Sequence, residues 1–109
     1  MAQNDMYAVM YRIIAYLYSC MKKGEEPDIS EWDARAMGIP AQYWAGIVGE
    51  LVEHGYIAGV EVWRSGRETK VAPSLPRVTM EGVAFAEENS MMAKARKLLL
   101  DMRVLLPTP

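Results

Sequence analysis

Four basic side chains lie in or near one turn-forming stretch of the chain. Arg64 and Arg67 flank Ser65-Gly66, a pair typical of a tight turn, and Lys70 and Arg77 follow. Guanidinium and ammonium groups neutralise phosphates, so a hairpin with these cations can hold about two or three phosphates of a nucleic acid. An ordinary hairpin, whose edge strands carry cations that prevent aggregation, would show the same residues.

A second set of candidate residues belongs to a helix that we expect to begin at Pro40 and to end before Gly55. Gln42 is the only side chain on its expected outer side that is suited to reading bases, and the carboxylates there repel phosphate. Each glycine inside a helix costs about 1 kcal/mol relative to alanine, which suggests a close neighbour there. That neighbour is a partner protein, the DNA backbone, another helix or an element of the same domain. The expected outer side comprises Gln42, Ala45, Gly46, Gly49, Glu50 and Glu53.

Side chains for catalysis are scarce. The chain has one histidine and one cysteine, and we expect Cys20 to be a buried, inert thiol on an apolar helix. His54 follows Glu50 and Glu53, and we interpret this group as a solvated face with a cation near a helix C-terminus. No phosphate-binding glycine loop and no metal-ligand spacing occurs in the sequence. We therefore expect no enzyme activity, no catalytic residues, no cofactor and no metal.

The elements that position these residues follow from hydrophobic periodicity. Trp44, Ile47, Val48 and Leu51 recur at helical spacing, and Gly55 is placed for a left-handed C-terminal cap. A strand is expected from Ile57 to Arg64. A returning strand is expected from Thr69 and should be interrupted between Pro73 and Pro76.

A short helix from a Ser30 cap to Met37 precedes the central helix so closely that the two resemble a helix-turn-helix. With the hairpin that follows, they predict an α+β winged helix-turn-helix. A further helix is expected from Thr79 to Asn89.

The first and last helices carry more apolar surface than one core face needs. The first is expected to be capped by Asn4 or Asp5 and to run to about Lys22 or Lys23. It is apolar nearly all round, so it must be covered by a later element or by a second subunit. The last is expected from a Ser90 cap to about Leu105. We expect it to pack on the first helix, either within the chain or across a homodimer. Its predicted apolar stripe is Met91, Ala95, Leu98, Leu99, Met102 and Leu105.

Size and charge limit the classes of protein. The chain has 109 residues and a net charge of −2, which suits a single domain at residues 1–106 with a short tail at 107–109. Dedicated nucleic-acid binders usually carry a basic surplus, so any such contact must use a local patch. A lone cysteine fits a reducing compartment, and no apolar run approaches the roughly 20 residues of a membrane span. We expect a soluble cytoplasmic protein that does not bind membranes.

Two blocks of residues carry a resemblance to a known family. The first block is Tyr43-Trp44-Ala45, Ile47, Leu51, Gly55-Tyr56-Ile57 and Gly59-Val60. The second is Pro76-Arg77-Val78-Thr79, Gly82, Phe85, Glu87-Glu88-Asn89-Ser90-Met91-Met92 and Lys94-Ala95. With the apolar first helix they cover nearly the whole chain, which resembles the YjcQ-like family of small winged-helix proteins from Gram-positive bacteria and their prophages. The resemblance implies a fold and a setting; DNA binding in the family is inferred from fold, and no catalytic residues carry over.

Two functions follow as expectations. The first is a winged-helix protein of phage or mobile-element type that binds DNA or regulates transcription, with weak, sequence-blind affinity through Arg64, Arg67, Lys70 and Arg77. The alternative is a protein-protein interaction module, such as a phage accessory or anti-defence factor that binds a host protein. Its contact face would be the outer side of the central helix, at Gln42, Ala45, Gly46 and Gly49.

Overall fold

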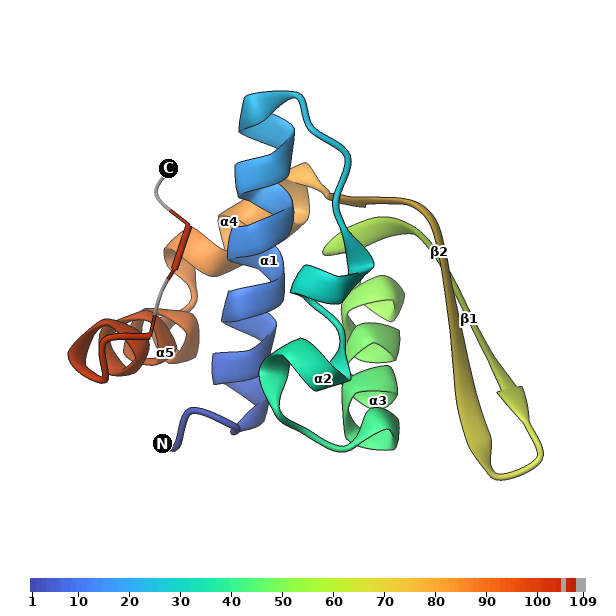
Figure 1. Cartoon of the computed structure of the whole chain (residues 1–109). Coiled ribbons are helices and arrows are strands. Elements are labelled where there is room, and N and C mark those ends of the chain that lie inside the picture. Colours follow the sequence, from blue (N-terminus) through green and yellow to red (C-terminus); the bar gives the residue numbers. More distant parts are fainter. Residues whose placement is uncertain (105, 108–109) are drawn as a thin grey trace.

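The computed structural model describes residues 1–104 and 106–107. Within them the chain is α+β, with five α-helices and one antiparallel hairpin, an arrangement compatible with a winged helix (Figure 1). The elements are α1 (Met6–Lys23), the 3-10 turn η1 (Ile29–Glu31), α2 (Ala34–Met37), α3 (Ala41–Glu53), β1 (Ile57–Ser65), β2 (Glu68–Val78), α4 (Met80–Glu88) and α5 (Ser90–Asp101).

Helix α1 is the centre of the fold. It contacts α3 and β2 on one side and α4 and α5 on the other, which explains why its sequence is apolar nearly all round (Figure 1). Ile13 and Leu17 of α1 are buried with Trp32 and Trp44 in the main core. The two indole rings lie 5.6 Å apart, and Trp44 Nε1 donates a hydrogen bond to the Trp32 carbonyl oxygen at 2.8 Å.

Helix α5 packs against α1 within the chain, one of the two arrangements predicted, but through only part of the predicted stripe and over a shorter length. It ends at Asp101 instead of about Leu105, which lies outside the described residues. The residues buried in α5 are Met92, Ala95 and Leu99, whereas Met102 is 49% exposed. Ala95 and Leu99 form a small cluster with Ala8 of α1. The cover that α1 requires is therefore supplied by the same chain.

Helix caps differ from those predicted at two places. Asn89, not Ser90, caps α5, because its side-chain oxygen accepts hydrogen bonds from the amides of residues 91 and 92. Ser30 opens no α-helix: its backbone amide and hydroxyl both donate to Asp28, and Asp33 caps α2 by accepting from the amide of residue 36. At both places an Asn or Asp side chain takes the capping role predicted for the serine.

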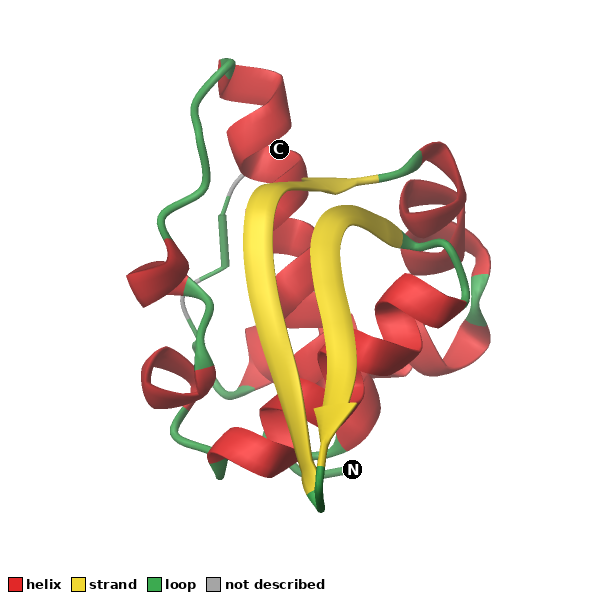
Figure 2. Ribbon diagram, turned by 90° about the vertical axis from the view of Figure 1, so that its right-hand side faces the viewer, coloured by secondary structure: helices red, strands yellow, loops and turns green. Residues whose placement is uncertain are grey.

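The hairpin lies across one side of the helical part of the molecule (Figure 2), and both of its strands contact α3. Its tip extends away from the helices (Figure 1). Its register runs regularly from the Ser65–Glu68 pair to the Val60–Pro73 pair and shifts between Ala58 and Val60. The interruption predicted between Pro73 and Pro76 is therefore a bulge at the base of the hairpin, and β2 continues through it to Val78.

The hairpin is tied to the helices at its base. Thr79 donates its hydroxyl to the Gly55 carbonyl and accepts a hydrogen bond from the Gly82 amide, so the start of α4 is joined to the end of α3. Gly55 has the predicted left-handed conformation, with φ at 72°. No helix in residues 1–104 and 106–107 has the length and apolar character that crossing a membrane requires.

Candidate nucleic-acid interface

The two faces of the hairpin have different surroundings. Val62 and Arg64 of β1, with Thr69 of β2, line a groove of about 420 Å³ against α3. Side chains alternate between faces along a strand, so Trp63 and its cross-strand partner Lys70 lie on the opposite face. We call the first the inner face and the second the outer face of the hairpin.

Gln42 joins α3 to the inner face. Its side-chain oxygen accepts a hydrogen bond from the Thr69 amide at 2.8 Å, and its Nε2 donates to the Thr69 carbonyl oxygen at 3.2 Å. Both ends of this amide therefore bind the backbone of β2. The side chain that the sequence analysis considered suited to reading bases is therefore engaged within the protein, and it joins the hairpin to α3.

The prediction of which residues lie on the outer side of α3 is only partly correct. Ala45 is 3% exposed and belongs to the core, so its predicted place on an outer face is wrong. Gly46 is exposed, and a Cβ added there would meet nothing within 4 Å. Gly49 is half-buried, with the position of its missing Cβ 3.5 Å from Val62 Cγ1, so its close neighbour is the hairpin of the same chain.

Glu50 and Glu53 also line the groove, together with Arg64. Two carboxylates against one guanidinium give this groove an acidic balance, which opposes the entry of a phosphate backbone. Carboxylates and the hairpin itself therefore occupy this side of α3.

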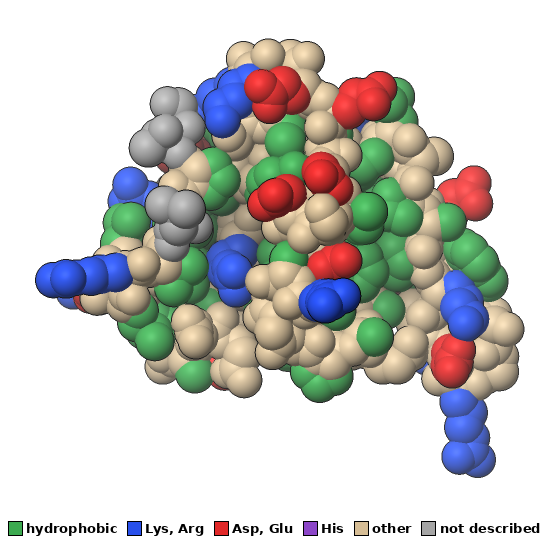
Figure 3. All heavy atoms as spheres, in the orientation of Figure 1, with side chains coloured by type: hydrophobic (Ala, Val, Ile, Leu, Met, Phe, Trp, Pro, Cys, Tyr) green, Lys and Arg blue, Asp and Glu red, His purple; other side chains and the backbone are tan. Residues whose placement is uncertain are grey.

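The predicted cations fall into two places. Arg64, Arg67 and Lys70 lie near the turn of the hairpin, far from its base. There Arg64 Nη2 donates a hydrogen bond to the Arg67 carbonyl oxygen at 3.4 Å. Arg77 is paired with Ala58 at the base, beyond the bulge. Figure 3 shows basic side chains at the far end of the hairpin with an acidic one among them.

That acidic neighbour matters for Lys70. Its Nζ lies 2.7 Å from a carboxylate oxygen of Glu68, and this hydrogen bond and charge lower the pKa of Glu68. Both side chains are about half exposed, so the pair is screened by solvent and leaves Lys70 able to exchange its partner for a phosphate.

Trp63 was not selected from the sequence. It is 47% exposed on the outer face, directly across from Lys70, whereas Trp32 and Trp44 are buried in the core. The alternation that turns Val60 and Val62 inward could have placed it outward. We call Trp63, Arg64, Arg67 and Lys70 the distal hairpin cluster: one exposed aromatic ring and three cations within eight residues of chain.

The residues considered for catalysis are not part of the distal hairpin cluster. His54 Nδ1 lies 3.6 Å from a Glu50 carboxylate oxygen, and the imidazole stacks on Tyr56 with ring centroids 5.6 Å apart. Cys20 is buried in α1. Among the described residues, no three side chains of His, Cys, Asp or Glu come together as a metal site would require.

The Gln42–Thr69 pair gives a first testable prediction. Gln42→Ala should remove two solvent-exposed hydrogen bonds and lower the free energy of unfolding by about 1 kcal/mol. The Thr69 amide should lose protection against hydrogen exchange more than amides of the core helices do. Gln3→Ala is the control, because Gln3, the other glutamine of the chain, lies in the exposed N-terminal segment. Unchanged protection at Thr69 in Gln42→Ala would contradict the pairing.

Comparison with known proteins gives one match. The family model described as YjcQ protein matches residues 11–103, which is most of the chain. The chain belongs to this family, and the resemblance seen in the sequence is confirmed. No curated protein and no solved structure matches the chain.

Proposed function

We propose that this member of the YjcQ family is a winged-helix protein that binds DNA through its hairpin, weakly and without sequence preference, in a phage or mobile-element setting. The observation that carries the proposal is the distal hairpin cluster, in which three cations and an exposed tryptophan stand on a projecting hairpin. Cations supply phosphate contacts, and an exposed indole adds a surface on which a base or sugar can pack.

The charge of the hairpin supports this assignment. It carries Arg64, Arg67, Lys70 and Arg77 against Glu61 and Glu68, whereas the whole chain has a net charge of −2. A DNA backbone is therefore attracted to the hairpin and not to the molecule as a whole. The Gln42–Thr69 pair holds the hairpin in one position, which reduces the ordering cost of binding.

The outer side of α3 supports the absence of sequence preference. A specific site commonly gains about 4–10 kcal/mol over non-specific DNA, largely from base contacts in the groove. Here Gln42 is bound to Thr69, Ala45 is buried, and Glu50 and Glu53 repel phosphate. Phosphate contacts alone give affinity without sequence information.

A protein-interaction module is the second candidate. It is favoured by the same acidic groove, which suits a basic partner segment better than a nucleic acid. Arg64 lines this groove and also belongs to the distal hairpin cluster, but the other residues of the two candidate surfaces differ. An experiment that measures retention on DNA therefore separates the candidates.

That experiment removes three cations from the distal hairpin cluster. The variant Arg64→Ala, Arg67→Ala, Lys70→Ala should lose retention on random-sequence duplex at low salt, because about two or three phosphate contacts disappear. Fluorescence anisotropy with a labelled duplex of random sequence measures the affinity.

The control removes three cations from exposed positions on the helices, through Lys23→Ala, Lys94→Ala and Lys97→Ala. This variant has the same net charge and should bind almost as the unmodified chain does. Equal loss in both triple variants would mean that overall charge, not the hairpin, governs retention. If the unmodified chain does not bind at all, the protein-interaction candidate is favoured.

A further inference from the structure

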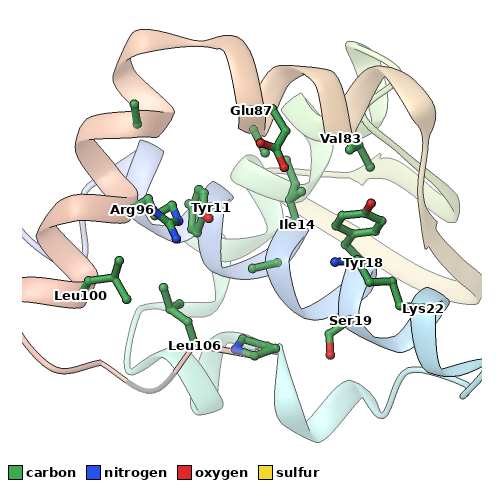
Figure 4. Close-up of a pocket in the computed structure, with 14 residues that line it drawn as sticks. Tyr11, Ile14, Tyr18, Ser19, Lys22, Val83, Glu87, Arg96, Leu100 and Leu106 are labelled. Atoms are coloured by element: carbon green, nitrogen blue, oxygen red, sulfur yellow. The ribbon is translucent and has the colours of Figure 1, made fainter. Parts of the chain in front are cut away.

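A second groove lies on the helical side of the molecule, lined by α1, α4, α5 and the described C-terminal residues Leu106 and Pro107. Its volume is about 630 Å³, within the range of about 300–1,000 Å³ usual for small-molecule sites. Figure 4 shows side chains of all three helices directed into this space. Nothing in the hairpin contributes to its lining, so it is separate from the proposed DNA contact.

The walls of the groove are largely apolar. Ile14 of α1 is buried at the floor, Val83 of α4 is half-buried, and Leu100 of α5 is 47% exposed. Tyr11 and Tyr18 of α1 present aromatic rings along the same wall (Figure 4). A ligand with a hydrocarbon chain or an aromatic ring would cover apolar surface of the protein that is accessible to solvent in this groove.

The charged groups around the groove are two cations and one carboxylate. Arg96 of α5 lies beside Tyr11, and Glu87 of α4 faces the same space (Figure 4). The ammonium group of Lys22 is placed over the Tyr18 ring, 4.1 Å from its centroid. Among the described residues, neither Arg96 nor Lys22 forms a salt bridge with a carboxylate of the chain. The groove is therefore locally positive in a protein whose net charge is negative.

Tyr11 adds a hydrogen-bond donor beside Arg96. Burial raises the pKa of the Tyr11 hydroxyl, and the neighbouring Arg96 opposes this only in part. The hydroxyl therefore keeps its proton throughout the physiological range. A guanidinium and a phenol next to one another suit a carboxylate, which can accept two parallel bonds from arginine and a third from tyrosine.

We infer that this groove binds a small amphipathic carboxylate, with the apolar part along Ile14, Val83 and Leu100 and the carboxylate at Arg96 and Tyr11. The lining carries two cations, Lys22 and Arg96, and one carboxylate, Glu87, and this balance matches a ligand with one negative charge. Arg96 is more suited than Lys22 to orient the ligand, since its planar fork matches both carboxylate oxygens.

Dodecanoate, used below its critical micelle concentration, is the probe, and dodecanol is its uncharged counterpart. Isothermal titration calorimetry of the full chain should give one site for dodecanoate and weaker binding of dodecanol. The backbone amide signals of Ala15, Ala86 and Ala93 should shift on titration, because these residues line the groove.

Arg96→Gln should lower the affinity for dodecanoate at least about tenfold, because a charge-assisted pair is lost. The affinity for dodecanol should not change. Lys97→Gln is the matched control, since it removes a cation from the next position of α5 outside the groove. It should leave both ligands unaffected. Ala93→Phe, on the exposed wall, narrows the groove and should weaken both ligands.

Three results would overturn the inference. The first is no binding of dodecanoate, and the second is equal affinity for dodecanoate and dodecanol that Arg96→Gln does not change. The third is self-association of the chain that Leu100→Glu abolishes, which would make the groove a contact between two copies.

Discussion

Leu99→Asp should lower the free energy of unfolding by at least about 4 kcal/mol, the size reached when an unpaired charge replaces a core side chain. Leu99 is fully buried where α5 meets α1, and with Ala95 and Ala8 it forms the small second core. An aspartate at this fully buried position would lose its hydration among apolar side chains. Urea denaturation followed by circular dichroism measures the change.

Met102→Asp is the matched control, because Met102 directly follows α5 and is 49% exposed. It should change the free energy of unfolding by less than about 0.5 kcal/mol. If Leu99→Asp were soluble, monomeric and as stable as the unmodified chain, α5 could not be packed on α1 as described.

The second large effect is expected at the base of the hairpin. Gly59 has φ at 75°, and a Cβ added there would overlap the carbonyl oxygen of Leu75. Gly59→Ala would therefore combine backbone strain with a collision between two strands, and the bulge at Ala58 and Val60 would have to rearrange. We expect a loss of about 3 kcal/mol or more, since a left-handed non-glycine residue alone costs about 1–2 kcal/mol.

Gly66→Ala separates these two contributions. Gly66 lies in the turn of the same hairpin with φ at 63°, but a Cβ there would meet no atom within 4 Å. It should show only the backbone strain, about 1–2 kcal/mol. Equal losses in the two variants, measured by thermal unfolding at matched concentration, would mean that the close approach of Gly59 to Leu75 does not exist in solution.

The sequence predicted the elements that depend on local periodicity. The stripe of Trp44, Ile47, Val48 and Leu51 correctly predicted α3, and Gly55 correctly marked its end, because both depend on spacing and backbone conformation alone. The packing of the last helix on α1 followed from the excess of apolar surface on both.

The surroundings of Ala45, Gly49 and Gln42 were not predicted from the sequence, because they depend on how the hairpin folds back onto α3. Ala45 and Gly49 are small enough for an exposed or a covered position, and only the proximity of β1 decides it. Gln42 could bind a base or a backbone, and nothing in its neighbours along the chain points to Thr69, 27 residues away. Contacts of this sequence separation are not specified by local patterns.

Helix ends were missed for a different reason. Ser90 and Asn89 are adjacent, and both residue types favour the capping position, so the sequence does not distinguish which of them caps α5. The predicted tail at residues 107–109 lies largely outside the described part of the chain, since only Pro107 of it is described.

The central claim is that the distal hairpin cluster binds DNA through phosphates, and the salt dependence of binding tests it most directly. Affinity for a random duplex should be measured between 50 and 200 mM salt, a range of about fourfold over which phosphate contacts weaken strongly. Two or three contacts predict that log K falls against log salt with a slope of about −2 to −3. The variant Arg64→Ala, Arg67→Ala, Lys70→Ala should show no measurable binding even at 50 mM salt, and the slope should be unchanged for the helix-cation control. No binding of the unmodified chain at 50 mM salt, or the same affinity and slope in the hairpin variant, would contradict the account.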